Sequence, residues 1–240
     1  MSLAPEISII IPVYNDATHI GKSIETLMNF TQSAGLNAEV LIINDGGKDA
    51  TAEMVANKAK KYTAIRFINR AENLGKGASV REGIASARGE FIIFTDADLP
   101  YGVKYFKEMA DCLKSGLADL VIANRNLILK PETHNLKLGM LRRLTHWGFA
   151  FLVRHMLNLE FSDTQAGLKG ISRKAARMLL PKLKIDGFAF VLEFLVEAQK
   201  IGLKIQEVPV ILENIGESNI SVIRDSFEMF KDIIKISLRY

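Results

Sequence analysis

Two aspartates follow an apolar stretch directly: residues 90–100 read EFIIFTDADLP, and only Ala97 separates Asp96 from Asp98. In an extended chain alternate side chains point the same way, which places these carboxylates about 6–7 Å apart. Neighbouring carboxylates repel each other unless a positive charge joins them. Mg²⁺ binds one or two protein carboxylates together with substrate phosphates. The pair therefore predicts a site for Mg²⁺ or Mn²⁺. The alternative is that Asp98 caps a helix while Asp96 is solvated.

Polar residues also follow the two earlier apolar stretches. Pro12, Tyr14 and Asp16 come at the end of the first, and Asp45 comes at the end of the second. The Asp45 carboxylate can accept hydrogen bonds from a nucleobase edge. It can equally form an Asx turn with the two glycines that follow it. Both interpretations remain open from the sequence.

A glycine-rich segment, NLGKGASVREGI at 73–84, places Lys76 between Gly75 and Gly77. The phosphate-loop pattern GxxxxGK[ST] is absent, so the segment is a weak motif by itself. The glycines allow a tight entry into a helix whose N-terminus favours an anion, and Lys76 adds a positive charge. The alternative is an ordinary glycine-rich turn.

Other kinds of site are disfavoured. Four histidines without ligand spacing and a single cysteine, Cys112, argue against zinc. Neither a GxSxG elbow nor a GxGxxG fingerprint after the first apolar stretch is present. The net charge of +4 favours an anionic ligand or a membrane surface and is far from that of a nucleic-acid-binding protein. The lone cysteine fits a reducing compartment, so we expect a cytoplasmic protein, with peripheral contact at the membrane face.

The residues above need a scaffold that brings strand ends together. Short apolar, β-branched runs predict buried parallel strands, and helical stretches alternate with them. The strands are expected at 7–13, 39–45, 64–69, 90–96 and 119–123, and the helices at 18–33, 50–62, 76–88 and 102–115. This alternation predicts an α/β fold with a doubly wound, mostly parallel sheet and helices on both faces. Such sheets bind ligands at the carboxyl ends of their strands.

The pattern changes after residue 124. We expect a short strand at 167–172, helices near 173–180 and 190–201, and an edge strand at 205–212 that contains Pro209. The C-terminal segment predicts an amphipathic helix with one apolar stripe: Phe227, Phe230, Ile233, Ile234 and Leu238. Residues 136–159 are apolar and basic, and predict either a helix pair in the core or a segment that lies on a membrane. We interpret residues 1–240 as one domain with a nucleotide-binding half (6–124) and an acceptor-binding half (125–240).

Six segments occur in the order seen in family 2 glycosyltransferases. They are IIPVYND, LIINDGGKDAT, NLGKGASVREGI, TDADLP, DTQAGLKGISR and DGFAFVLEFLVEAQKIGLKIQEVPV. The chain resembles this family over about residues 6–240. Within the family it is most similar to the dolichyl-phosphate β-glucosyltransferases and the bacterial polyprenyl-phosphate glycosyltransferases. The resemblance implies a GT-A fold, a nucleotide-sugar donor (UDP-glucose first, GDP-mannose second) and a lipid phosphate acceptor.

The resemblance also assigns roles to residues. It implies that Pro12, Tyr14 and Asp45 hold the nucleoside, and that Asp96 and Asp98 form the DxD motif that carries the metal ion against the diphosphate. By the same likeness Asp163, Thr164 and Gln165 line the sugar or acceptor site, and Arg125, Arg142 and Arg143 meet the acceptor phosphate.

Three positions depart from the family pattern. Asp16 stands where the family usually has Glu, and Val191 stands where the family has Asp. Asn44 precedes Asp45 where the family often has Asp or Ser. Glu193, two residues later, remains. We predict that Asp163 and Glu193 orient groups or bind the sugar, with a helix cap or a surface carboxylate as the alternative.

The expected reaction is a single displacement with inversion at the anomeric carbon. A lipid monophosphate is already largely anionic near pH 7, so it needs positioning by arginine rather than a general base. Two other functions remain open. One is a glycosyltransferase that acts on a hydroxyl acceptor of a surface glycan, and the other is a sugar-nucleotide-binding module without catalysis.

Overall fold

The computed structural model describes residues 4–128, 153, 156–213 and 222–239, without the side chains of 222–227. Seven strands form one sheet in the order β3-β2-β1-β4-β6-β5-β7. Their bounds are Ile7–Val13 (β1), Ala38–Asn44 (β2), Ile65–Asn69 (β3), Phe91–Phe94 (β4), Leu120–Asn124 (β5), Lys169–Ser172 (β6) and Ile205–Pro209 (β7). Neighbouring strands are parallel except at β6, which is antiparallel to both β4 and β5. The predicted mostly parallel sheet is confirmed.

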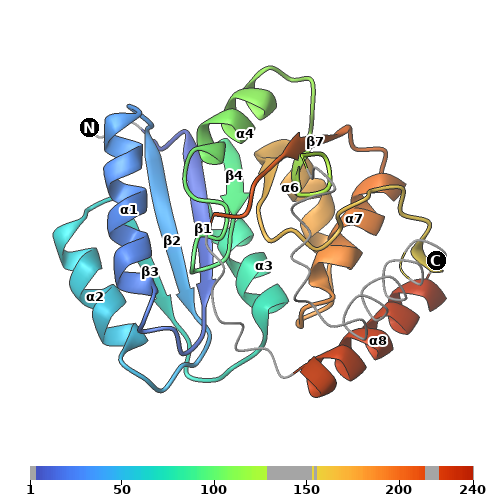
Figure 1. The fold of residues 1–240 in the computed structure, drawn as a ribbon, viewed down its shortest axis with the longest axis horizontal. Coiled ribbons are helices and arrows are strands. Elements are labelled where there is room, and N and C mark those ends of the chain that lie inside the picture. Colours follow the sequence, from blue (N-terminus) through green and yellow to red (C-terminus); the bar gives the residue numbers. More distant parts are fainter. Residues whose placement is uncertain (1–3, 129–152, 154–155, 214–221, 240) are drawn as a thin grey trace.

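Helices cover both faces of the sheet (Figure 1). Their bounds are Ile20–Ser33 (α1), Thr51–Lys61 (α2), Lys76–Ser86 (α3), Tyr105–Lys114 (α4), Arg173–Leu179 (α6), Phe190–Lys200 (α7) and Val222–Leu238 (α8), with a 3₁₀ turn at Leu180–Lys182. Alternate residues of β1 face opposite layers: Ile9 and Ile11 pack in the same cluster as α1 and α4, whereas Ile10 packs with α3 and α7. This burial on both faces explains the continuous apolar runs.

The later part of the chain agrees with the prediction except at its end. β7 lies at the edge of the sheet, as Pro209 suggested. Among the described side chains of α8, Ile233 and Ile236 are buried, while Phe230 and Leu238 are exposed. The expected stripe of Phe227, Phe230, Ile233, Ile234 and Leu238 is therefore wrong in part, because the helix turns Ile236 rather than Leu238 toward the core. The side chain of Phe227 lies outside the described residues.

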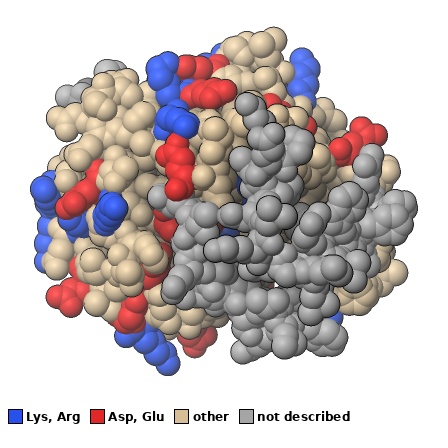
Figure 2. Space-filling model, in the orientation of Figure 1, with Lys and Arg blue, Asp and Glu red and all other residues tan. Residues whose placement is uncertain are grey.

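Several expectations fall on residues that the structure does not describe. Most of the apolar and basic segment 136–159 is among them, as are Arg142 and Arg143. None of the described helices is long and apolar enough to cross a bilayer. On the described surface in Figure 2, lysine and arginine side chains are interspersed with acidic ones.

Candidate active site

A cavity of about 340 Å³ opens at the carboxyl end of β4. One side of its lining is polar and contains Lys76, Asp96 and Gln165. The other side is apolar or aromatic and comes from α3, β4, the 187–191 segment and α8: Val80, Phe94, Phe188, Phe190, Val191 and Met229. Three residues predicted for the site thus share one cavity, as expected for strand ends in an open α/β sheet.

Asp96 is the best-placed of the predicted metal ligands. β4 ends at Phe94, so Asp96 and Asp98 lie in the turn after the strand rather than in extended chain. The Asp96 Oδ1 atom forms an ion pair with Lys76 Nζ. A Cβ atom at Gly167 would overlap Asp96 Oδ2, so any larger residue there would have to displace the carboxylate. The carboxylate is therefore held between a lysine and the backbone of the 163–168 segment.

Asp98 lies in the field of other acids. Burial, and then repulsion from Asp96 and Asp16, raise the pKa of Asp98. The helix-cap alternative for Asp98 is wrong, since the following helix begins only at Tyr105. Repulsion between two carboxylates at one turn is the condition that a divalent cation relieves. Asp96 and Asp98 are the residues that would hold Mg²⁺ or Mn²⁺. The described residues contain no cluster of three or more ligand side chains, so substrate phosphates would supply the further oxygens.

Arg125 and Asp163 form a second charged group near Asp96. Nε and Nη2 of Arg125 donate to the two carboxylate oxygens at 2.7 and 2.8 Å, and the Arg125 backbone N–H donates at 2.9 Å. Burial works to raise the pKa of Asp163, but the hydrogen bonds from Arg125 outweigh it and hold the pKa below its usual range. The hydrogen bonds to Asp163 and its charge raise the pKa of Arg125, and the charge of Asp96 adds a smaller contribution. These contacts show that Asp163 fixes the Arg125 guanidinium, while its predicted role at the substrate stays a prediction.

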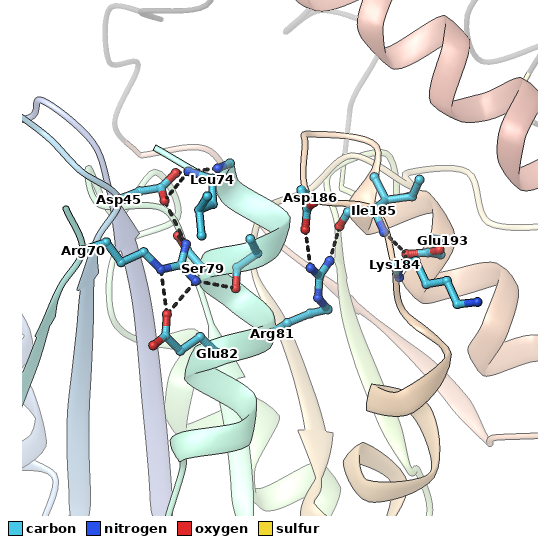
Figure 3. Close-up of polar contacts among 12 residues, drawn as sticks. Asp45, Arg70, Leu74, Ser79, Arg81, Glu82, Lys184, Ile185, Asp186 and Glu193 are labelled. Atoms are coloured by element: carbon cyan, nitrogen blue, oxygen red, sulfur yellow. Dashed lines mark hydrogen bonds and ion pairs between the residues drawn. The ribbon is translucent and has the colours of Figure 1, made fainter. Parts of the chain in front are cut away.

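Asp45 is buried and bound within the protein. Its Oδ1 accepts from Arg70 at 2.8 Å and from Leu74 N–H at 3.0 Å, and its Oδ2 accepts from Gly75 N–H at 2.8 Å (Figure 3). These bonds go to residues 70–75, so the Asx-turn alternative does not account for the residue. Asp45 fixes the segment that leads into Lys76. Its contact with a nucleobase stays a prediction.

Three of the residues predicted to bind the nucleotide, Pro12, Tyr14 and Asp16, lie at or just after the end of β1. Tyr14 is exposed, and Pro12 is partly buried within the strand. Asp16 accepts a hydrogen bond of 2.6 Å from His19 and donates its backbone N–H to Thr51 at 2.9 Å. The charge of Asp16 also contributes to the raised pKa of Asp98.

The glycines around Lys76 pack against the 185–187 segment of the chain. The N–H groups of Gly77 and Ala78 donate to the carbonyl oxygen of Asp186 at 2.6 and 3.2 Å. A Cβ atom at Gly77 would lie 2.5 Å from the carbonyl oxygen of Ile185. The expectation that the α3 N-terminus binds an anion is therefore wrong for these two groups. The glycines allow the 185–187 chain to approach, and that chain occupies the donors.

Glu193 is not among the residues that line the cavity. Its side chain is fully buried. Oε2 accepts from the N–H groups of Lys184 and Ile185 at 2.8 Å each, and Oε1 accepts from Arg239 at 2.8 Å. Figure 3 shows Glu193 directed at the 184–185 segment and Arg81 directed at the neighbouring Asp186. These contacts assign Glu193 to holding that segment. The predicted role at the substrate has no support in its contacts.

Glu193→Gln should therefore affect stability first. The amide keeps the two backbone hydrogen bonds but turns its NH₂ group toward Arg239, so the free energy of unfolding should fall by about 2 kcal/mol. Urea denaturation measures this change. Glu108→Gln, on the exposed face of α4, is the control and should stay within about 0.5 kcal/mol. Equal stability of both variants would contradict the assignment.

Two residues that the sequence reasoning missed lie beside this site. Tyr101 is buried, and burial raises its pKa to about 12, with Arg125 opposing the rise and Asp163 and Asp96 adding to it. Lys169 is fully buried in β6, with Nζ bonded to the carbonyl of Ala166 and 3.5 Å from that of Thr164. Burial lowers the pKa of Lys169 to about 7, although Asp163 and Asp96 act against that change. A lysine between apolar residues, in LKGIS, was the only signal in the sequence.

The Lys169 pKa predicts a pH dependence of stability. Between pH 7 and the ordinary lysine pKa the unfolded chain binds a proton that the folded protein does not, so the free energy of unfolding rises with pH. Relative to Lys169→Met, the wild type should gain about 2 kcal/mol between pH 7 and pH 9 and nothing below pH 6. Urea denaturation of both proteins over this range measures the difference. A constant difference would exclude the shifted lysine.

Solved structures with the same architecture are glycosyltransferases. A glucosyl-3-phosphoglycerate synthase from Mycobacterium tuberculosis in complex with phosphoglyceric acid superposes with a TM-score of 0.72 at 18% identity, covering 97% of this chain and 80% of that one. The complex of that enzyme with Mn²⁺, UDP-glucose and phosphoglyceric acid superposes with a TM-score of 0.67, covering 98% of this chain and 79% of the other. This likeness confirms the GT-A fold.

Relatives are closer in sequence. The "Dolichyl-phosphate beta-glucosyltransferase" of Dictyostelium discoideum is 31% identical over 98% of this chain and 74% of its own length. The "Dolichyl-phosphate beta-glucosyltransferase ALG5C" of Trichomonas vaginalis is 33% identical over 96% of this chain and 70% of its own. The family model described as "Glycosyl transferase family 2" matches residues 8–180. The chain therefore belongs to glycosyl transferase family 2.

Proposed function

We propose that the protein transfers a hexose, glucose before mannose, from a nucleotide sugar to a polyprenyl phosphate such as dolichyl or undecaprenyl phosphate. The observation that carries the proposal is that two charged groups lie near each other: the Lys76–Asp96 ion pair, which lines the cavity, and the Arg125–Asp163 ion pair, whose arginine feels the charge of Asp96. Lys76, Asp96 and Asp98 suit a metal-bound diphosphate, and Arg125 suits an anionic acceptor. Relatives named dolichyl-phosphate beta-glucosyltransferase, about 30% identical over nearly the whole chain, support the same substrates.

The donor is held by residues at the ends of β1, β2 and β4. Asp45 fixes the backbone on which Lys76 stands, and Lys76 supplies a positive charge for a phosphate. Asp96 and Asp98 would hold Mg²⁺ or Mn²⁺. A divalent cation at that place stabilises the negative charge that develops on the departing diphosphate. Pro12, Tyr14 and Asp16 are proposed to contact the nucleoside, UDP first and GDP second.

The acceptor phosphate is proposed to bind at Arg125. Asp163 takes the Nε and Nη2 edge of the guanidinium and fixes its plane. None of the described residues accepts a hydrogen bond from Arg125 Nη1, and the Arg125 side chain is about one-third exposed. A phosphate monoester is already anionic, so its oxygen can attack the anomeric carbon without a general base. Gln165, on the cavity wall, is proposed to contact the sugar.

The test uses a purified protein with radiolabelled UDP-glucose or GDP-mannose, Mn²⁺ or Mg²⁺, and undecaprenyl phosphate in detergent. The expected result is a lipid-soluble hexosyl phosphate and free nucleoside diphosphate in equal amounts, with inverted anomeric configuration by NMR. Transfer to soluble saccharides with none to lipid phosphate would instead support the hydroxyl-acceptor alternative. Donor binding by calorimetry without any turnover would support the non-catalytic module.

A further inference from the structure

The ion pair between Lys76 and Asp96 occupies the point where donor and metal are proposed to meet. Both residues line the same cavity, and the two side chains are 29% and 31% exposed. A positive charge that belongs to the protein therefore already neutralises the carboxylate on which a divalent cation would sit.

The backbone around Lys76 is fixed on both sides. Gly75 N–H donates to Asp45 at 2.8 Å, and Gly77 N–H donates to the carbonyl of Asp186 at 2.6 Å. Gly75 has a φ of 104°, in the region that favours glycine. Because the main chain is clamped in this way, any change in the position of the ammonium group must come from rotation of the Lys76 side chain, which borders open cavity.

The Asp96 carboxylate lies close to the backbone of the segment that precedes β6. Its Oδ2 atom occupies the space that a side chain at position 167 would fill, and Gly167 leaves that space open. Oδ1 is the edge bonded to Lys76. A cation that binds this oxygen must therefore share it with Lys76 or replace Lys76.

We propose that Lys76 is a displaceable counter-ion of Asp96, which moves from the carboxylate to the donor's diphosphate when a divalent cation takes its place. This inference rests on the proposed function and adds to it a coupling between metal and nucleotide. Without nucleotide, Lys76 and the metal compete for Asp96. With nucleotide, the diphosphate accepts Lys76 and removes the competition, so each ligand raises the affinity for the other by the same factor.

The test is the effect of Lys76→Met on two affinities. Electron paramagnetic resonance of free Mn²⁺ gives the metal affinity without nucleotide, and calorimetry gives the UDP affinity at saturating Mn²⁺. Loss of the competing ammonium should raise the Mn²⁺ affinity about 3- to 10-fold. Loss of the charged contact should weaken UDP about 10-fold. Lys76→Arg keeps the positive charge, so it should show neither the gain in Mn²⁺ affinity nor the loss of UDP affinity.

A matched control comes from the other end of the sheet. Lys114 pairs with Glu6 at 2.9 Å and has a similar exposed fraction of 31%. Lys114→Met removes the same charge and should change neither affinity by more than about twofold, because exposed charges at such a separation are screened by salt. If Lys76→Met and Lys114→Met gained equally in Mn²⁺ affinity, the gain would come from the lower net charge of the protein and not from the loss of a competing ammonium group at Asp96.

The inference is overturned if Mn²⁺ binds Lys76→Met no better than the wild type. If that variant does not fold, the wild type is labelled with ¹³C-dimethyl groups on its lysines and the Lys76 resonance is assigned by its absence in Lys76→Arg. That resonance should move on addition of Mg²⁺ alone, and a resonance that stays fixed contradicts displacement. Failure of the wild type to bind Mn²⁺ or UDP at all is a separate result that counts against the proposed function.

Discussion

Asp96→Asn is expected to lower kcat/KM for sugar transfer by about 10³-fold, the loss typical when a main stabiliser of developing charge is removed. Asparagine fills the same space beside Gly167 but removes the charge that a cation and Lys76 share. The same change should abolish the rise in melting temperature that UDP and Mn²⁺ produce together, since ligand stabilisation follows affinity. Single-turnover transfer assays and thermal melts measure the two effects.

Asp111→Asn is the control for Asp96→Asn. Asp111 lies on the surface of α4 in an ion pair with Lys107, away from the cavity lining. This variant should keep wild-type turnover and the full thermal shift. If Asp96→Asn kept transfer within tenfold of the wild type, Asp96 would not be the group that carries the metal-bound diphosphate.

Arg125→Met should have the second largest effect, a loss of about 10² in kcat/KM for the lipid phosphate, because a charged hydrogen bond to a phosphate contributes about 1.5–3 kcal/mol. The variant also leaves Asp163 buried without its main partner. Donor affinity should stay within about twofold, since Arg125 is proposed to act on the acceptor alone. Initial rates at varied acceptor concentration separate this result from a general loss of folding.

Asp163→Asn should give a smaller loss than Arg125→Met, about 10-fold, because it loosens the guanidinium without removing it. Arg177→Met, on the exposed side of α6, is the control and should be neutral. If the UDP affinity fell by as much as the transfer rate, Arg125 would be assigned to binding the donor rather than the acceptor.

The residue types alone determined much of the framework. Apolar runs such as ISIIIPV must be buried on both faces, and their alternation with amphipathic stretches leaves few arrangements besides a doubly wound sheet. Polar residues at the ends of these runs then have to gather at one edge, which is why Asp45 and Asp96 could be assigned to a common site. These signals are local, so they are visible in the chain before it folds.

The tertiary structure decided which residues meet. β6 enters antiparallel between β4 and β5, and this insertion sets Gly167 against Asp96 and Asp163 against Arg125. It also buries Lys169, for which the only signal in the sequence was its place in the segment LKGIS. Contacts of this kind join residues that lie 38 or more positions apart, and periodicity carries no information about such pairs.

The same limit explains the two misjudged segments. The glycines beside Lys76 looked like an anion site, but the chain at 185–187 occupies those N–H groups. Glu193 looked available to a substrate, yet the 184–185 backbone and Arg239 use its carboxylate. A buried polar group must find a partner, and only packing at long range determines whether that partner is a ligand or another part of the chain.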